Sequence, residues 1–184
     1  MSKPTLIFRG GRVQPTSVID LQPDIDAVRA IAQQEADASQ DIVIIAHSWA
    51  GLPVSSALDG LSKSEREAAG QKGRRCETHL HRRFPTEHWR GFDRRVRWDA
   101  PAVEENGTVT ASDPLVLFFH DVADGAEWVK LLKPHSWATQ NAPATGAAYM
   151  NIPSVYLLTE EDRATPLPVQ QVLVERARRR GGAD

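Results

Sequence analysis

The order of apolar and polar positions predicts strands that alternate with helices in the first part of the chain. The run Pro4-Thr-Leu-Ile-Phe8 is typical of a short buried strand, and Arg9-Gly-Gly-Arg12 ends it. From Asp24, an N-cap candidate after Pro23, apolar residues recur at helical spacing to about Ala38. A second apolar run begins after Asp41 and continues as a strand that leads straight into Ser48. This alternation predicts a parallel sheet.

The remaining periodic segments continue the pattern. Leu52 to Leu58 is expected to be helical, and Ser64-Glu-Arg-Glu67 is expected to be a capping box that opens another short helix. Residues Asp113 to Leu132 fit one or two helices with an apolar face. Ile152 to Leu158 is predicted to be a strand, and Val169 to Ala177 a closing helix.

The junction after the second apolar run carries the strongest chemical signal. The strand leads directly into Ser48, and the residues two before and two after it, Ala46 and Ala50, are small, with Gly51 next. A nucleophile elbow needs small residues there so that the backbone can pass through a strained turn. We therefore predict a nucleophile elbow, although both glycines of the usual G-x-S-x-G pattern are replaced. The alternative is an ordinary strand-turn-helix with an incidental serine.

Length and composition narrow the class of protein. A chain of 184 residues with a net charge of −2 fits one domain without a general attraction to nucleic acid or membrane. The single cysteine, Cys76, excludes an internal disulfide framework. With no leader and no apolar run near the roughly 18 residues that span a bilayer, we expect a soluble cytoplasmic protein. No cofactor and no metal are expected, and the oligomeric state is left open.

Several ordered motifs occur along the chain. They are D-L-x-x-D-x-x-A-V, A-H-S-x-x-G with G-L-S-K-x-E-R behind it, N-G-x-V-x-x-x-D-P, W-x-x-x-L-x-P-x-S and I-P-x-x-Y-L-x-x-E-x-D-x-x-x-P. The segments that contain them are Leu21 to Val28, Ala46 to Arg66, Asn106 to Pro114, Trp128 to Ser136 and Ile152 to Pro166. In this order the motifs resemble an α/β-hydrolase family that is abundant in fungi and related to plant methylesterases and hydroxynitrile lyases.

This resemblance implies a fold and a set of site residues. The fold would be an α/β-hydrolase fold, a mostly parallel sheet flanked by helices with a small helical cap at 113–150, here incomplete. Ser48 matches the nucleophile, and Asp162 matches the acid that orients a histidine. The backbone N–H of Trp49 would be one oxyanion donor, and Gly11 with Arg12 is the nearest match for the second.

The resemblance also implies a histidine after the acid, and none follows His135 in this chain. We expect the base to be missing through truncation. His47 is expected to be a packed structural residue, because as the neighbour of the nucleophile it points the other way along the turn. His120 and His135 are expected to be surface or capping residues of the cap.

The predicted function is that of a serine hydrolase acting on a carboxylic ester, thioester or lactone of a small molecule. Related proteins with the same triad geometry also support lyase chemistry. Without the histidine, the activity of this chain is doubtful, and the alternative is an inactive or misannotated hydrolase fragment.

Residues 74–100 break the pattern. Eight of the 17 arginines fall here against four acidic residues, which gives this segment a net charge of +4 and leaves −6 for the remainder. We interpret the segment as aberrant and predict that it does not form the buried strand expected at this place. Codons for Arg74 to Phe84 can be chosen that, read one nucleotide later, encode an apolar strand, so our hypothesis is translation out of frame to about Ala100.

Two functional alternatives for this segment remain. Cys76, His79, His81 and His88 could ligate zinc, although C-x-x-H-x-H is not a common spacing. The arginines, interleaved with Trp89, Phe92 and Trp98, could instead bind single-stranded nucleic acid by charge and stacking. A solvated insertion is favoured over both.

Overall fold

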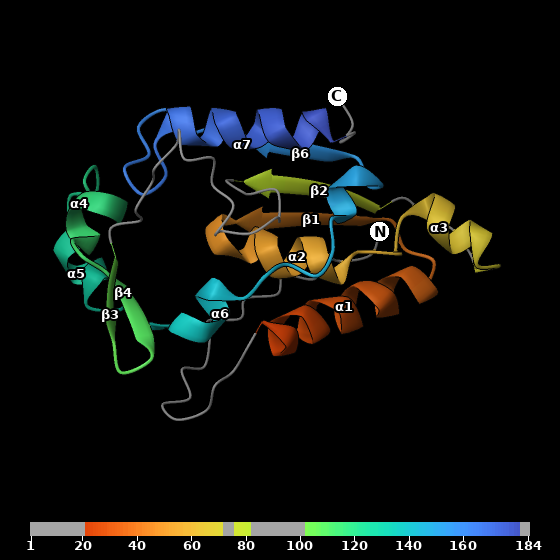
Figure 1. The fold of residues 1–184 in the computed structure, drawn as a ribbon, viewed down its shortest axis with the longest axis horizontal. Helices are drawn as coiled ribbons and strands as arrows, with labels where there is room; N and C mark the ends of the chain where they lie inside the picture. The colour runs from red at the N-terminus through yellow and green to blue at the C-terminus, as the bar shows by residue number, and fades with distance from the viewer. Residues whose placement is uncertain (1–20, 72–75, 82–101, 181–184) are drawn as a thin grey trace.

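A computed structural model describes residues 21–71, 76–81 and 102–180. The predicted strand Pro4–Phe8 lies outside these residues. Figure 1 shows the arrangement of the elements. In chain order they are α1 (Gln22–Asp37), β1 (Ile42–His47), the 3-10 helix η1 (Ser48–Ala50), α2 (Gly51–Ala57), α3 (Lys63–Ala68), β2 (Cys76–His81), β3 (Ala102–Glu105), β4 (Thr108–Ala111), α4 (Pro114–Phe118), α5 (Gly125–Val129), β5 (His135–Ser136), α6 (Trp137–Asn141), the 3-10 helix η3 (Ala148–Met150), β6 (Ser154–Leu157) and α7 (Leu167–Arg179).

The predicted parallel sheet is confirmed. Its strand order is β1-β2-β6, and both neighbouring pairs are parallel. The register aligns His47 with His81 and His81 with Leu157, so the carboxyl ends of the three strands lie side by side. We call this end of the sheet its carboxyl edge. In Figure 1 this edge faces the side on which α4, α5, β3 and β4 lie. Segments that leave the three strands at this edge are therefore neighbours in space.

The central strand β2 corrects a sequence prediction. We predicted that the arginine-rich segment does not form the strand expected at this place, yet Cys76–His81 is a strand that pairs with β1 on one side and β6 on the other. The prediction rested on the polarity of the side chains. The strand is held instead by hydrogen bonds from its backbone N–H and C=O groups to the two neighbouring strands. The rest of the segment lies outside the described residues, so the out-of-frame hypothesis stays untested.

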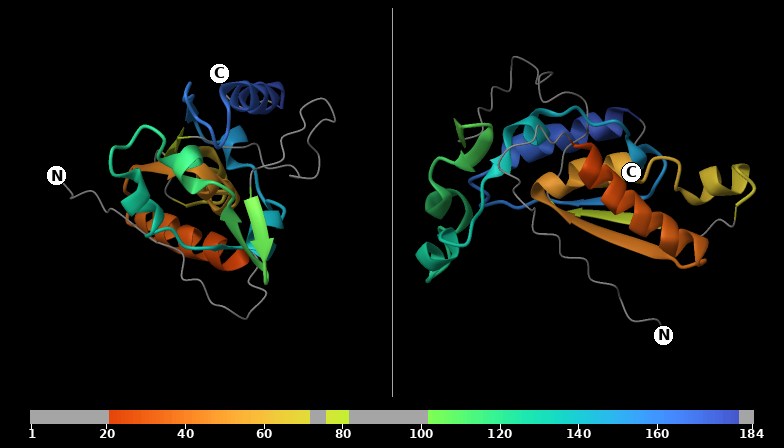
Figure 2. Two further views of the ribbon diagram at one scale, coloured as in Figure 1. Left: turned by 90° about the vertical axis from the view of Figure 1, so that its left-hand side faces the viewer. Right: turned by 90° about the horizontal axis from the view of Figure 1, so that it is seen from below.

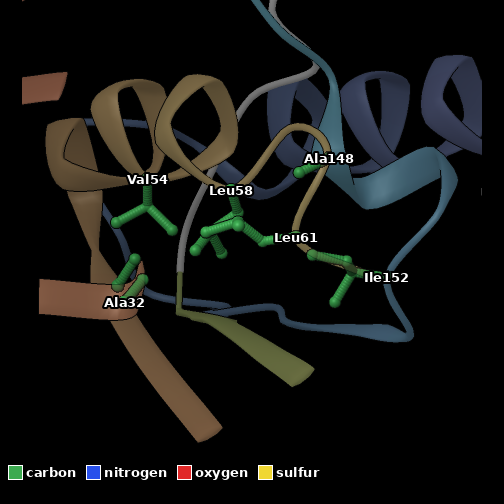
Figure 3. Packing of buried hydrophobic residues seen from close by; sticks show 7 residues of the cluster. Ala32, Val54, Leu58, Leu61, Ala148 and Ile152 are labelled. Carbon is green, nitrogen blue, oxygen red and sulfur yellow. The ribbon is translucent and has the colours of Figure 1, made fainter. Parts of the chain in front are cut away.

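The hydrophobic core lies between β1 and the helices α1 and α2. Ala46 of β1 is buried against Ala32 of α1 and Val54 of α2, and Ile42 and Ile44 pack against the same cluster. Leu58, Leu61, Ala148 and Ile152 complete it, as Figure 3 shows. Because alternate residues of a strand point to opposite faces, Ile42, Ile44 and Ala46 form the inner face of β1. The core thus holds the strand that ends at Ser48.

The opposite face of β1 and β6 is exposed. Val43 and Ile45 of β1 and Val155 and Leu157 of β6 are all more than half exposed, and Ile45 reaches 75%. Ile45 and Val155 align with the same residue of β2, which places them on one face. The helices α1 and α2 therefore cover only one side of this sheet.

Two predicted helix starts are shifted. Helix α1 begins at Gln22 with Leu21 as its N-cap, and Asp24 lies in its first turn rather than at the cap. Pro23 explains this shift, because proline suits the first positions of a helix, where no N–H partner is needed. The capping box is made by Ser62 and Glu65, not by Ser64 and Glu67.

Helix α3 is held by a network of polar contacts. Glu65 N donates to Ser62 Oγ (3.2 Å), Ser62 N donates to Glu65 Oε2 (3.1 Å), and Asn151 Nδ2 donates to Glu65 Oε1 (2.9 Å). Burial raises the pKa of Glu65, but the bonds from Ser62 and Asn151 outweigh it, so the pKa lies below 4.5. The Arg66 guanidinium, 2% exposed, bonds Asp37 (2.9 Å) and holds that carboxyl's pKa below 3.8.

A second, antiparallel sheet was not predicted. Its strand order is β3-β4-β5, and Asn106 and Gly107 turn the chain between β3 and β4 with φ of 52° and 77°. Asn-Gly is the preferred pair for a two-residue hairpin, so this signal was present in the sequence. The predicted helical segment 113–132 forms the short helices α4 and α5, with many apolar side chains exposed.

This second part of the fold lies beyond one end of the parallel sheet. In the right-hand view of Figure 2, α4, α5 and the β3–β4 hairpin lie at the opposite end from α3. Among the described residues, no helix is long and apolar enough to cross a membrane.

Candidate functional site

Ser48 lies at the strained turn where β1 passes into α2. The backbone is extended at His47, adopts φ of +50° at Ser48, and enters η1 and then α2 directly. A positive φ is uncommon for a residue other than glycine and costs free energy, which surrounding structure must offset. The Ser48 side chain is exposed at the carboxyl edge of the sheet. It is therefore accessible to a substrate.

The residues around Ser48 show why the turn needs small side chains. Ala46 is buried in the core, Gly51 is buried at the start of α2, and Ala50 packs against the core cluster. Larger side chains at these places would enter a filled core. Ala46, Ala50 and Gly51 therefore let the backbone turn at Ser48 without a clash against the core.

Asp162 lies in the loop that follows β6. It is 8% exposed, and its Oδ1 accepts hydrogen bonds from the backbone N–H groups of Ala164 (2.9 Å) and Thr165 (3.0 Å). Its Oδ2 accepts from Thr159 Oγ1 (3.4 Å) and Gln170 Nε2 (3.5 Å). These contacts fix the orientation of the carboxylate.

The sheet brings the Ser48 and Asp162 segments to one edge. β1 and β6 flank β2, and both run toward the same end. With strands about 4.8 Å apart, the ends of β1 and β6 are separated by about 10 Å. In open parallel sheets, ligands bind beyond the carboxyl ends of the strands. Ser48 and Asp162 both follow strands that end at this edge.

Trp49, next to Ser48, connects the turn to the second part of the fold. Its ring meets the His135 ring edge to face, with centroids 4.6 Å apart. His135 Nδ1 lies 3.0 Å from the Ser136 carbonyl oxygen, which can only accept, so Nδ1 donates this hydrogen bond. His135 was expected at the surface or at a cap, but it is half-buried against Trp49.

The other predicted residues have different outcomes. His47 was expected to be packed, but it is exposed, because it belongs to the uncovered face of β1 together with Val43 and Ile45. Gly11 and Arg12, the predicted second oxyanion donors, lie outside the described residues. The Trp49 N–H lies in the first turn of η1, where amides have no partner within the helix.

Gln170 was not among the residues predicted for the site. This residue of α7 is 0% exposed, and its side-chain amide bonds the backbone on both sides of Asp162. Its only sequence signal is that glutamine takes an apolar position of a predicted helix, beside the buried Val169 and Leu173.

No group of three or more His, Cys, Asp or Glu residues that could hold a metal ion exists within the described ranges. The side chains of Cys76, His79 and His81 and all of His88 fall outside the described structure, so the zinc hypothesis is not tested there.

Comparison with known proteins identifies the class. A model of the alpha/beta hydrolase family matches residues 9–182, so the chain belongs to that family. The chain is 30% identical over 154 residues to the alpha/beta hydrolase nvfD of Aspergillus novofumigatus (strain IBT 16806). The match covers 80% of this chain and 62% of that relative, so this chain spans less than two thirds of the relative's length. No solved structure matches.

Proposed function

We propose that this chain is a serine hydrolase that cleaves a carboxylic ester, thioester or lactone of a small molecule. The observation that supports this most strongly is Ser48, exposed at a positive φ of 50° between a parallel strand and a helix. Asp162 follows β6, which is separated from β1 by one strand, and two backbone N–H groups hold its carboxylate in place. This arrangement supports the role of triad acid for Asp162.

The proposed reaction follows from these positions. The Ser48 hydroxyl loses its proton to a base and attacks the carbonyl carbon, and the charge that develops on the carbonyl oxygen meets the Trp49 N–H. Collapse of the tetrahedral intermediate breaks the bond to the alkoxide or thiolate, which leaves with the proton. Water then attacks the acyl-enzyme and restores the serine.

A histidine side chain that lies in space between Ser48 and Asp162 would complete this site. An imidazole that is hydrogen-bonded through both nitrogens spans about 7 Å between its partner atoms, which suits an edge where the strand ends lie about 10 Å apart. The six histidines of the chain all precede Asp162, whereas the family order places the base after the acid.

That sequence order favours a second candidate function. In this alternative the chain keeps the family fold but does not catalyse ester hydrolysis, because an unassisted serine hydroxyl is a poor nucleophile. Loss of the base of such a triad lowers the rate by several orders of magnitude.

Hydrolysis of p-nitrophenyl acetate by the wild-type chain and by Ser48→Ala separates the two candidates. Ser55→Ala is a matched control, because Ser55 is a serine of α2 that is buried in the core. The hydrolase proposal expects turnover that is lost in Ser48→Ala and kept in Ser55→Ala. Equal rates for the wild type and Ser48→Ala would overturn it and support the second candidate.

A further inference from the structure

The side chain of Gln170 closes the loop that carries Asp162. Its Oε1 accepts from Thr159 N (3.0 Å), and its Nε2 donates to Thr159 O (3.0 Å). One side-chain amide therefore satisfies both backbone groups of Thr159, as a neighbouring strand would do. Thr159 lies two residues beyond the end of β6, so this contact holds the chain after the strand has ended.

The same nitrogen reaches the far side of the loop. Nε2 also donates to Thr165 O (2.6 Å), and it lies 3.2 Å from Thr159 Oγ1 and 3.5 Å from Asp162 Oδ2. Thr165 in turn donates its backbone N–H to Asp162 Oδ1 (3.0 Å). Gln170 thus connects both ends of the loop and lies against the carboxylate between them.

A fully buried amide at this position is costly unless it bonds. An amide that is buried without a partner loses its hydrogen bonds to water, whereas an apolar residue would fill the same helix face without that cost. Gln170 is 0% exposed and uses both its carbonyl oxygen and its nitrogen. On the same helix the neighbouring Gln171 is exposed, so its side-chain amide can bond to water.

We propose that Gln170 is a positioning residue that fixes the orientation of the Asp162 carboxylate by joining Thr159 to Thr165. This inference rests on the proposed function, in which Asp162 orients the base. Gln170 acts through Asp162 and does not touch the substrate. Its substitution should therefore lower the rate of the chemical step and leave substrate binding unchanged.

The test is a double-mutant cycle in the full chain, with kcat and KM measured on p-nitrophenyl acetate. The variants are Gln170→Leu, Asp162→Asn and their combination, with Gln171→Leu as the matched control. Misplacement of the acid by Gln170→Leu should lower kcat roughly 10- to 100-fold. KM should stay within about twofold, because a positioning residue contributes to the transition state rather than to uniform binding. Gln171→Leu should match the wild type.

The double variant distinguishes positioning from general damage. If Gln170 acts through Asp162, Gln170→Leu should lower kcat little further in the Asp162→Asn background. If the two substitutions act independently, their losses in kcat should multiply. Gln170→Met serves as a second variant if the leucine variant does not fold, because its unbranched side chain keeps the length of glutamine while it removes the acceptor for Thr159 N and the donor to Thr165 O.

The outcomes separate the two levels of inference. Equal rates for the wild type and Ser48→Ala would overturn the proposed function and this inference with it. A wild type that depends on Ser48 and Asp162, together with unchanged kcat in both Gln170 variants, would overturn the positioning role alone. A multiplicative loss in the double variant would also contradict it.

Discussion

Replacement of Leu58 by alanine tests the packing that holds the Ser48 turn. Leu58 follows α2, is 0% exposed, and belongs to the core cluster that also contains Ala46 of β1 and Val54 of α2. Removal of such a side chain deletes its contacts and leaves a cavity that the core only partly fills. We expect a loss of about 3 kcal/mol in the free energy of unfolding.

The matched control is Ile45→Ala on the uncovered face of β1. Ile45 is 75% exposed, so its truncation removes little buried area and should change stability by no more than about 0.5 kcal/mol. For a chain of this size, the Leu58 variant should melt about 6–12 °C below the wild type. Thermal and urea unfolding followed by circular dichroism measure both variants. Equal losses for Leu58→Ala and Ile45→Ala would refute this description of the two faces of the sheet.

Three further substitutions test polar contacts. Ser62→Ala should lower the free energy of unfolding by about 1 kcal/mol, because the capping box is lost. Urea unfolding should show that this difference from the wild type narrows below pH 4.5, as Glu65, whose pKa is lowered, becomes protonated. Asp37→Asn should lower the melting temperature at pH 7, because Arg66 loses its carboxylate partner, and the gap should narrow as the pH falls from 3.8 through the lowered pKa of Asp37; a gap that does not change with pH would contradict this. Trp49→Phe should keep or raise the melting temperature, because the buried indole N–H has no hydrogen-bond partner in the described structure, whereas Trp49→Ala should lower it; equal losses would be inconsistent with this.

The sequence predicted those parts of the fold that depend on local patterning. The helix expected over Leu52 to Leu58 lies at Gly51–Ala57, and the strand expected to lead into Ser48 ends at His47. Apolar periodicity and small flanking residues contain this information, because each element buries one face against the same core. The alternation of strands and helices was also enough to predict parallel pairing.

Contacts between distant segments were beyond sequence reasoning. β2 was missed because its position depends on backbone bonds to β1 and β6, which side-chain polarity does not reveal. The role of Gln170 becomes visible only when Thr159 and Thr165 are brought to either side of it. The hairpin at Asn106 and Gly107 differs from these, because its signal was local and was overlooked.

Covalent labelling with a fluorophosphonate tests the role of Ser48 most directly. The reagent phosphonylates an activated serine, and trypsin cleavage after Arg29 and Lys63 releases one peptide that carries Ser48, whose fragments locate the adduct by mass spectrometry. We expect the folded chain to carry the adduct on Ser48, Asp162→Asn to react more slowly, and Ser48→Ala to remain unlabelled. An adduct on another serine, or a folded wild type that reacts no faster than Ser48→Ala, would contradict the assignment of Ser48 as the nucleophile.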